Sequence, residues 1–419
     1  MMANLKGFYK RSMVERIELL AAEIGLSDEQ TTMMRLHQSV IGDNQVENYL
    51  YNFGVPTGLL IDLPVNGRLV NVPMSTEEPS VIAAANNGAK MMRAGLGVQT
   101  QASQRLVRGQ IVLTDIVDMV TLQQYVTLHE TELLQIANTA HPSMARRGGG
   151  AKSILFEQLD EQRAIVNILV DPQAAMGANV VNTMAEAVAD ELRGQGYSVL
   201  MAILSNLASE ALIHATVRIP VAALATKQGV TGAEIAVKIA EASLIETLSP
   251  YRAATANKGL LNGIEAAVLA SGNDTRAVNA TLHAFAARSG QYRGLTRWTV
   301  AGAELVGETT LPLLLGVVGG SIGIVPAVKL NHQIMGNPTV EELTAIVAAV
   351  GLAQNLAALR ALVSTGIQAG HMALQAKSLA LQVGAQPDEV GKLTDLIQQA
   401  DKIDETHARA LLHALRNGK

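Results

Sequence analysis

Apolar residues recur at helical spacing in several parts of the chain, and two of these runs begin with a capping motif. Ser27 with Gln30, and Thr339 with Glu342, have the spacing of a capping box, in which paired side chains satisfy backbone N–H groups at a helix start. The run from Thr339 to about Val363 has apolar residues on more than one face, which is typical of a helix enclosed by others. We therefore expect a helix there, at the centre of a helical domain.

Between Gln110 and Asn206 the pattern changes to short runs typical of strands, which surround two helical stretches. The succession is strand, helix, strand, strand, helix, strand, which predicts the split βαβ or ferredoxin-like arrangement inserted into a helix-rich, discontinuous larger domain. After Gly366 the chain becomes charged and helical, without a strand signal. The fold class is thus α+β, with these domains: residues 1–105 with 207–366, residues 106–206, and a tail of residues 367–419.

One uncharged run of twenty residues, Thr309 to Val328, has about the length needed to span a bilayer. Its four glycines and two prolines would interrupt a spanning helix, so we expect two buried apolar segments joined by a glycine-rich turn. The first twenty residues lack the apolar stretch of a signal peptide and predict an amphipathic helix. The expectation is a cytoplasmic protein with no membrane partner.

The composition narrows the function classes. The 419 residues are 48% hydrophobic but only 3% aromatic, and the net charge is −5. No basic run is interleaved with aromatic residues, which argues against a nucleic-acid partner. The absence of cysteine excludes disulfides, thiolate metal sites and a cysteine nucleophile.

The common nucleotide and hydrolase fingerprints do not support a function. Neither G-x-G-x-x-G after a strand nor a P-loop is present, and H-E-x-x-H is absent. The one G-x-S-x-G match surrounds Ser321, but Pro326 follows too closely for the helix that a nucleophile elbow requires. A standard Rossmann site, a serine hydrolase and a zinc enzyme of this type are therefore disfavoured.

Several polar residues stand in apolar or glycine-rich surroundings, and each has a structural explanation beside a functional one. Glu78, after Glu77 and before a proline, could simply favour a helix start, and Asp274 could cap a helix. Lys258, beside a glycine, could be a solvated lysine, and His371 an ordinary helical histidine. These alternatives stay open from the residues alone.

A possible anion site follows a predicted strand, where small residues open a helix from Met176. Backbone N–H groups there could bind a pyrophosphate without the Rossmann spacing. Alone, the segment does not identify a ligand.

Taken together, these segments resemble the class II hydroxymethylglutaryl-CoA (HMG-CoA) reductases along almost the whole chain, in the family's order. The matching stretches are VENYLYNFGVP from Val46, EEPSVIAAA from Glu77, RRGGGAK from Arg146, AMGANVVNTMAEA from Ala175, ILSNLA from Ile203, SPYRAATANKG from Ser249, GND from Gly272, GVVGG from Gly316, and GLAQN followed by GIQAGHM.

The resemblance implies roles for individual residues, which fall into three groups. The implied catalytic residues are Glu78, Lys258, Asp274 and His371. The implied substrate-binding residues are Ser80, Arg252 and Asn262. The implied cofactor-binding residues are Met176, Gly177, Ala178 and Asn179, and we expect His141 and Arg146 of a basic loop to bind the cofactor as well.

The resemblance also implies an activity and an assembly. The expected reaction is reduction of HMG-CoA to mevalonate and CoA with two NADPH or NADH, or its reverse, in the mevalonate pathway. Lys258 would stabilise the oxyanion, and His371 and Glu78 would supply protons. Asp274 would hold Lys258. The expected assembly is a homodimer with the active site at the subunit interface and a mobile C-terminal flap that carries the histidine.

Four positions depart from the family pattern: Tyr51, Ala174, Ser249 and Ala256. None of them is an implied catalytic residue, so fine details of cofactor and CoA binding are affected. The loop from Ala140 to Lys152 has basic residues and no carboxylate, which favours the 2′-phosphate of NADPH. Two alternatives remain: a related acyl-CoA reductase with another acyl group, and a non-catalytic CoA-binding homologue.

Overall fold

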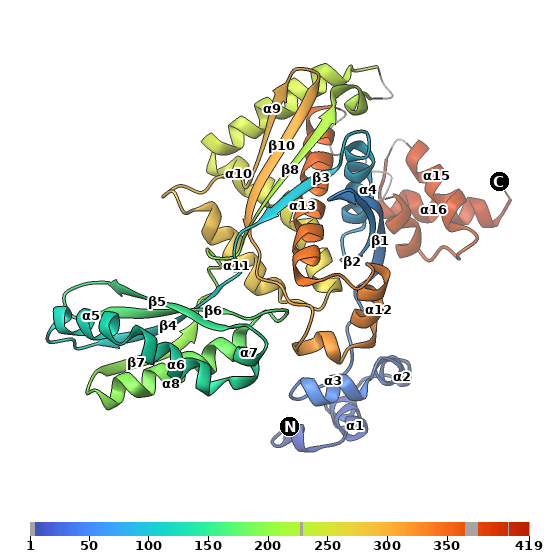
Figure 1. Ribbon diagram of the computed structural model, residues 1–419. Coiled ribbons are helices and arrows are strands. Elements are labelled where there is room, and N and C mark those ends of the chain that lie inside the picture. Colours follow the sequence, from blue (N-terminus) through green and yellow to red (C-terminus); the bar gives the residue numbers. More distant parts are fainter. Residues whose placement is uncertain (1–4, 227–228, 365–375, 401, 419) are drawn as a thin grey trace.

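The computed structural model describes residues 5–226, 229–364, 376–400 and 402–418. His371 therefore lies outside the described residues, as does the expected boundary between the larger domain and the tail. Within the described part, the chain is a mixed α and β structure with two separate sheets, which confirms the predicted class. Figure 1 shows the two sheets in two bodies, with α-helical segments at both ends of the chain.

The larger body contains a six-stranded sheet that the sequence analysis did not predict. Its order is β2-β1-β3-β8-β10-β9, and its strands are β1 (Thr57–Val65), β2 (Arg68–Ser75), β3 (Val98–Ala102), β8 (Leu212–Pro220), β9 (Thr296–Ala301) and β10 (Glu304–Pro312). The expectation of a helix-rich body was thus incomplete. Strand β8 alternates buried and accessible residues, because one face of the sheet packs on helices and the other meets solvent.

Long helices cover one face of this sheet. They are α4 (Pro79–Met92), α9 (Gly232–Leu248), α10 (Pro250–Ala270) and α13 (Val340–Val363), and α13 packs between α4 and α10. The predicted capping box of Thr339 and Glu342 begins α13. Helix α13 is also long and apolar enough to cross a membrane, but 72% of its most apolar window is buried inside the protein. The predicted central helix is confirmed.

The smaller body contains the predicted succession of strands and helices. Strands β4 (Val107–Thr114), β5 (Gly150–Gln158), β6 (Ala164–Asp171) and β7 (Ser198–Leu204) form an antiparallel sheet in the order β5-β6-β4-β7. The first helical stretch divides into α5 (Met119–Leu128), α6 (Glu130–Ala140) and α7 (Pro142–Arg146), and the second is α8 (Ala178–Gly194). Helices α6 and α8 pack on each other and on the sheet, enclosing a separate hydrophobic core.

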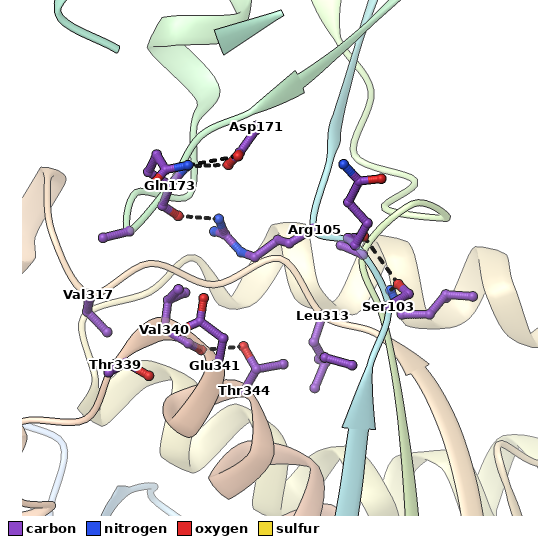
Figure 2. Close-up of a pocket in the computed structure, with 15 residues that line it drawn as sticks. Ser103, Arg105, Asp171, Gln173, Leu313, Val317, Thr339, Val340, Glu341 and Thr344 are labelled. Carbon is purple, nitrogen blue, oxygen red and sulfur yellow. Dashed lines mark hydrogen bonds between the residues drawn. The ribbon is translucent and has the colours of Figure 1, made fainter. Parts of the chain in front are cut away.

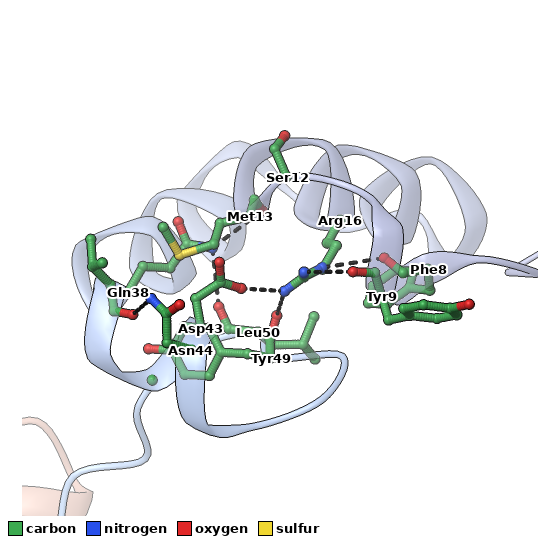
Figure 3. Close-up of polar contacts among 12 residues, drawn as sticks. Phe8, Tyr9, Ser12, Met13, Arg16, Gln38, Asp43, Asn44, Tyr49 and Leu50 are labelled. Carbon is green, nitrogen blue, oxygen red and sulfur yellow. Dashed lines mark hydrogen bonds and ion pairs between the residues drawn. The ribbon is translucent and has the colours of Figure 1, made fainter.

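The N-terminal segment folds around one buried arginine. Helices α1 (Met13–Ile24), α2 (Asp28–Leu36) and α3 (Val40–Gln45) follow the short 3-10 helix η1 (Phe8–Lys10). Arg16 donates to Asp43 Oδ1 at 2.5 Å and to the carbonyl oxygens of Phe8, Tyr9 and Tyr49 (Figure 3). These bonds satisfy a guanidinium that would be costly to bury alone.

The uncharged run from Thr309 to Val328 divides into two different halves. Strand β10 and the following Leu313–Leu315 are buried, as expected. The glycine-rich 3-10 helix η3 (Gly320–Gly323) and the start of α12 (Pro326–Ile334) are largely exposed, so the prediction of a second buried segment was wrong. Gly319 and Gly320 have positive φ angles, which allow the chain to turn away from the core. Pro326 is the first residue of α12, a position where proline is favoured, so it begins a helix and does not interrupt one.

The remaining elements connect or extend these bodies. The short 3-10 helix η2 (Val221–Leu224) leads toward α9, and α11 (Thr275–Ala286) follows α10. In the tail, residues 376–382, α15 (Val390–Gln399) and α16 (Glu405–Arg416) enclose a small core of their own. Within its described residues, the tail is helical, as predicted.

Candidate functional site

Helix α10 carries three of the predicted site residues. Ser249 caps it, because its Oγ accepts the Arg252 N–H, so this serine performs the capping that an aspartate would provide. Lys258 and Asn262 lie four residues apart and face the same side, whereas Arg252 lies about 120° around the helix from Lys258. Lys258 is exposed and, within the described ranges, makes no hydrogen bond or ion pair.

Glu78 and Ser80 meet at the start of α4, directly after β2. The Glu78 carboxylate accepts hydrogen bonds from the Ser80 N–H at 3.2 Å and from the Ser80 hydroxyl at 2.7 Å. Glu78 is therefore the N-cap of the helix, as the structural explanation of its sequence context predicted. Since α4 packs against α10, this carboxylate stands on an element next to the one that carries Lys258.

Asp274 is the N-cap of α11, which follows the C-terminal end of α10. It accepts the backbone N–H groups of Arg276 and Ala277, and it pairs with the Arg276 guanidinium at 2.8 Å. The hydrogen bond from Arg276 is the main cause that lowers the pKa of Asp274. In the part of the chain that the structure describes, no ion pair joins Asp274 to Lys258, so their expected pairing stays a prediction.

The predicted cofactor residues Met176 to Asn179 form the entrance to α8 in the smaller body. Gly177 has φ 102°, and a Cβ on it would lie 2.6 Å from Pro172 Cβ, so only glycine fits this turn. Among the described residues, no side chain caps α8, so the N–H groups of its first turn are suited to bind an anion. The turn before α8 is therefore tightly packed against Pro172 and Val107 and depends on glycine at position 177.

The basic loop lies around α7 in the same body. His141 is half-buried between α6 and α7, with Nδ1 3.4 Å from the Ser143 hydroxyl. Arg146 ends α7 and is exposed. Lys152 donates to the Gly148 carbonyl oxygen at 2.8 Å and is less available to a ligand. Arg147 is also exposed, but its Nε donates to the Ser143 carbonyl oxygen at 3.1 Å.

Arg105 joins the two bodies beside the cofactor loop. Its guanidinium donates to the carbonyl oxygen of Gln173 in the smaller body (Figure 2). It also donates to the carbonyl oxygens of Ala175 in the smaller body and of Leu315 in the larger one. Burial lowers the pKa of Arg105 to about 10, because the charged form loses solvation. A cavity of about 560 Å³ lies next to it, lined also by Asp171 and Glu341.

Three residues around the site were not identified from the sequence: Arg105, Asn257 and Asn273. Asn257 and Asn273 directly precede Lys258 and Asp274, and Asn257 is 1% exposed. Their place inside the NKG and GND stretches was a usable signal. Arg105 had no such signal, because its partners are backbone carbonyl groups that lie about 70 and 210 residues away along the chain.

Comparison with known proteins identifies the family to which this chain is related. The family model described as hydroxymethylglutaryl-coenzyme A reductase matches residues 12–376. The 3-hydroxy-3-methylglutaryl-coenzyme A reductase of Archaeoglobus fulgidus is 38% identical over 425 residues, covering 100% of this chain and 96% of the relative. A probable enzyme of the same name from Borreliella burgdorferi is 34% identical and covers 89% of this chain and 86% of the relative.

The fold agrees with this relationship. The structure of the class II 3-hydroxy-3-methylglutaryl-CoA reductase from Streptococcus pneumoniae, bound to NADPH in open conformations, matches with a TM-score of 0.76 and 44% identity. The match covers 97% of this chain and 100% of that one. Both the sequence and the fold are shared over nearly the full length, and the chain belongs to the hydroxymethylglutaryl-coenzyme A reductase family of oxidoreductases.

Proposed function

We propose that the chain reduces HMG-CoA to mevalonate and free CoA in two successive hydride transfers, with NADPH preferred over NADH. The observation that carries this proposal is the arrangement on α10, where Lys258 is solvent-facing and makes no ion pair with any residue that the structure describes, on the same helix as Arg252 and Asn262. A lysine ammonium that is not ion-paired with a protein carboxylate can stabilise negative charge on a substrate oxygen.

The residues of the smaller body suit a dinucleotide. Bound NADPH would supply the hydrides, and its pyrophosphate would lie at the N-terminus of α8, whose N-cap Gly177 provides no side-chain cap. The exposed Arg146 would face the 2′-phosphate, with His141 beside it. Met176, Ala178 and Asn179 complete the turn at the start of α8 and would position its backbone N–H groups toward the pyrophosphate.

The proposed mechanism divides the polar chemistry among four side chains. Lys258 stabilises negative charge on the carbonyl oxygen in both hydride transfers. His371 protonates the departing CoA thiolate, and Glu78 delivers a proton to the aldehyde oxygen. Asp274, whose pKa is lowered, stays ionised at neutral pH and holds Lys258 charged and oriented when the site closes.

Substrate binding falls to residues close to these groups. Arg252 would pair with the distal carboxylate of the hydroxymethylglutaryl group, because a guanidinium binds a carboxylate with two parallel hydrogen bonds. Asn262 shares a helix face with Lys258, and Ser80 is hydrogen-bonded to Glu78. Both can therefore orient the substrate beside a catalytic side chain.

We further propose that residues 1–105 and 207–366 form the substrate domain, residues 106–206 a ferredoxin-like cofactor domain, and residues 367–419 a flap that carries His371. The two sheets with separate hydrophobic cores, and the separate core of the tail, support this division. Closure of the flap over bound substrate would exclude water during hydride transfer.

A homodimer with the active site at its interface completes the proposal. Tyr251 and Leu248, next to Arg252, are 89% and 68% exposed, and Phe53 in the matching stretch from Val46 is 84% exposed. Large apolar side chains exposed beside a candidate site are typical of a surface that a partner covers.

The decisive experiment measures the loss of reduced-nicotinamide absorbance when the purified protein meets HMG-CoA and NADPH. We expect two equivalents oxidised per CoA released, and a fall in kcat of about 100-fold or more in Lys258→Ala. The matched control is Lys238→Ala, which changes an exposed lysine on the adjacent helix α9 and keeps full activity. A folded wild-type protein without hydride transfer would instead support the non-catalytic CoA-binding alternative.

The same assay identifies the acyl group. Arg252→Ala should raise the KM for HMG-CoA by about 10- to 100-fold, since a charge-assisted hydrogen bond contributes roughly 1.5–3 kcal/mol. An unchanged KM would favour an acyl-CoA reductase whose substrate has no distal carboxylate.

A further inference from the structure

Asn257, the residue before Lys258, binds the backbone of a distant segment with both ends of its side-chain amide. Its Nδ2 donates to the Arg293 carbonyl oxygen at 2.9 Å, and its Oδ1 accepts the Leu295 N–H at 2.8 Å. The side chain is 1% exposed, so these bonds form away from competing water.

Asn273, the residue before Asp274, does the same with another segment. Its Nδ2 donates to the Gly316 carbonyl oxygen at 3.0 Å, and its Oδ1 accepts the Gly316 N–H at 2.7 Å. A further bond from Nδ2 to the Ser271 hydroxyl, also 3.0 Å long, fixes the orientation of the amide. Two of the candidate catalytic residues, Lys258 and Asp274, thus each follow an asparagine that binds a remote backbone segment.

The two remote segments are the two ends of one β-hairpin. Leu295 directly precedes β9, and Gly316 lies shortly after β10 ends at Pro312. Nine backbone pairs join β10 to β8, and Trp298 of the hairpin donates to Asn355 of α13 at 2.7 Å. The Thr309 hydroxyl also donates to the Leu295 carbonyl oxygen at 2.7 Å. The hairpin is therefore a rigid frame with both ends anchored.

The Gly316 end also contacts the cofactor loop. Val317 N–H donates to the Ala174 carbonyl oxygen at 2.9 Å, and Ala175 pairs with Val318. A Cβ on Gly316 would lie 2.6 Å from the Met176 nitrogen, so the two backbones touch. A displacement of this segment would move the start of α8 as well.

We propose that Asn257 and Asn273 are positioning residues, which hold the backbone of Lys258 and Asp274 in a fixed position relative to the β9–β10 hairpin. Asn273 also fixes the position of the cofactor loop relative to Asp274. The inference rests on the catalytic roles proposed above for Lys258 and Asp274. The two asparagines do not touch the reacting atoms; they fix the backbone from which the two charged side chains extend.

The test replaces each asparagine by alanine and separates kcat from KM. A misplacement of about 1 Å can lower the rate by roughly 100-fold, so we expect kcat to fall about 10- to 100-fold in Asn257→Ala. The KM for HMG-CoA should stay within about threefold, because the groups proposed to bind ground-state substrate are intact. Asn273→Ala should lower kcat similarly and also raise the KM for NADPH.

Ser243→Ala is the matched control. Ser243 is 1% exposed, and its hydroxyl accepts the Trp298 N–H at 3.0 Å, so its loss leaves one buried backbone group of the same hairpin without a partner. It does not adjoin either catalytic residue. We expect its Tm to fall comparably to that of the asparagine variants, with kcat within about twofold of wild type.

The outcomes are distinguishable. Reduced kcat in both asparagine variants at an unchanged far-ultraviolet spectrum, with normal kcat in Ser243→Ala, supports the proposal. An unchanged kcat in the asparagine variants, or an equal fall in Ser243→Ala, overturns it. If Asn257→Ala does not fold, the test uses Asn273→Asp, which keeps the acceptor for the Gly316 N–H. A reduced kcat in this variant supports the proposal, and an unchanged kcat overturns it. A wild-type protein without activity contradicts the proposed function instead.

Discussion

At the scale of single residues, a structural role and a catalytic role coincide in this protein. Glu78 and Asp274 both cap helices, and both are proposed to act in the reaction. The hydrogen bonds that each carboxyl group makes at its helix start fix the position of the side chain. The structural explanation of such a residue therefore does not exclude the functional one, and the sequence context alone could not separate them.

The cofactor preference is a prediction at the same scale. Arg146→Ala should lower kcat/KM for NADPH by about tenfold and leave that for NADH nearly unchanged, because only NADPH carries the 2′-phosphate. Steady-state rates with both cofactors measure this. Arg193→Ala, which changes an exposed arginine at the far end of α8, is the control. An equal loss with both cofactors would show that Arg146 does not read the 2′-phosphate.

A buried carboxyl makes the stability depend on pH. Burial raises the pKa of Glu246 from 4.5 to about 7, partly offset by Arg252, and its Oε2 is buried without a hydrogen-bond partner among the described residues. Between about pH 4.5 and 7, the folded state holds a proton that the unfolded state has lost, so stability falls as pH rises. The shift corresponds to about 3 kcal/mol at pH above 7.

Glu246→Gln should remove this dependence. We expect the variant to lose less stability than wild type between pH 5 and 8, as measured by urea unfolding at both values. Glu241→Gln changes an exposed glutamate of the same helix and should follow the wild-type curve. Parallel curves for wild type and Glu246→Gln would contradict the prediction.

At the scale of elements, the sequence pattern was informative wherever a helix has a strong cap or a long apolar run. The start of α2 at Ser27 and that of α13 at Thr339 both show the expected capping box. The six-stranded sheet was missed because strands such as β3 are short and pair with partners far along the chain. Local periodicity carries little information about such pairings.

Close packing of α4 on α13 depends on one glycine. A Cβ on Gly88 would lie 2.0 Å from the Ala353 carbonyl oxygen, which is backbone and cannot move aside. Gly88→Ala should therefore destabilise the protein by about 1–3 kcal/mol or more, as seen in urea unfolding. Gly194→Ala, at the end of α8 with open space around it, is the control and should be neutral or stabilising.

A neutral Gly88→Ala variant would show that the two helices separate readily.

At the scale of the whole molecule, the smaller body meets the larger one at two sets of contacts beside the cofactor loop. The Arg105 guanidinium donates to backbone carbonyl groups of both bodies. The backbone of Ala174 and Ala175 also pairs with that of Val317 and Val318. The two bodies have separate cores, although Leu314 of the larger body packs into the core of the smaller one. Hydrogen bonds beside the cofactor loop and this apolar contact both join the bodies. The cytoplasmic location expected from the sequence stays a prediction.

The proposed dimer makes activity depend on concentration. If the active site lies at the subunit interface, specific activity should fall on dilution together with the dimer fraction in sedimentation velocity. Phe53→Ser, which changes an exposed aromatic residue, should shift both curves to higher concentration, whereas Leu128→Ser, on the exposed end of α5, should shift neither. A fully active monomer would contradict the interface location of the site.

The sequence by itself determined the α+β class, the succession of strands and helices in the smaller body, the central helix and the family. Each of these follows from local periodicity, capping chemistry or ordered motifs, which are written in consecutive residues. The tertiary structure alone decided that the side chains of Asn257 and Asn273 are hydrogen-bonded to the two ends of one hairpin. It also decided that Arg105 joins the two bodies and that Glu246 is buried beside Gly294. These depend on backbone groups brought together from distant parts of the chain, and a backbone carbonyl or N–H group has the same chemistry at nearly every position, so no pattern of side chains can mark it.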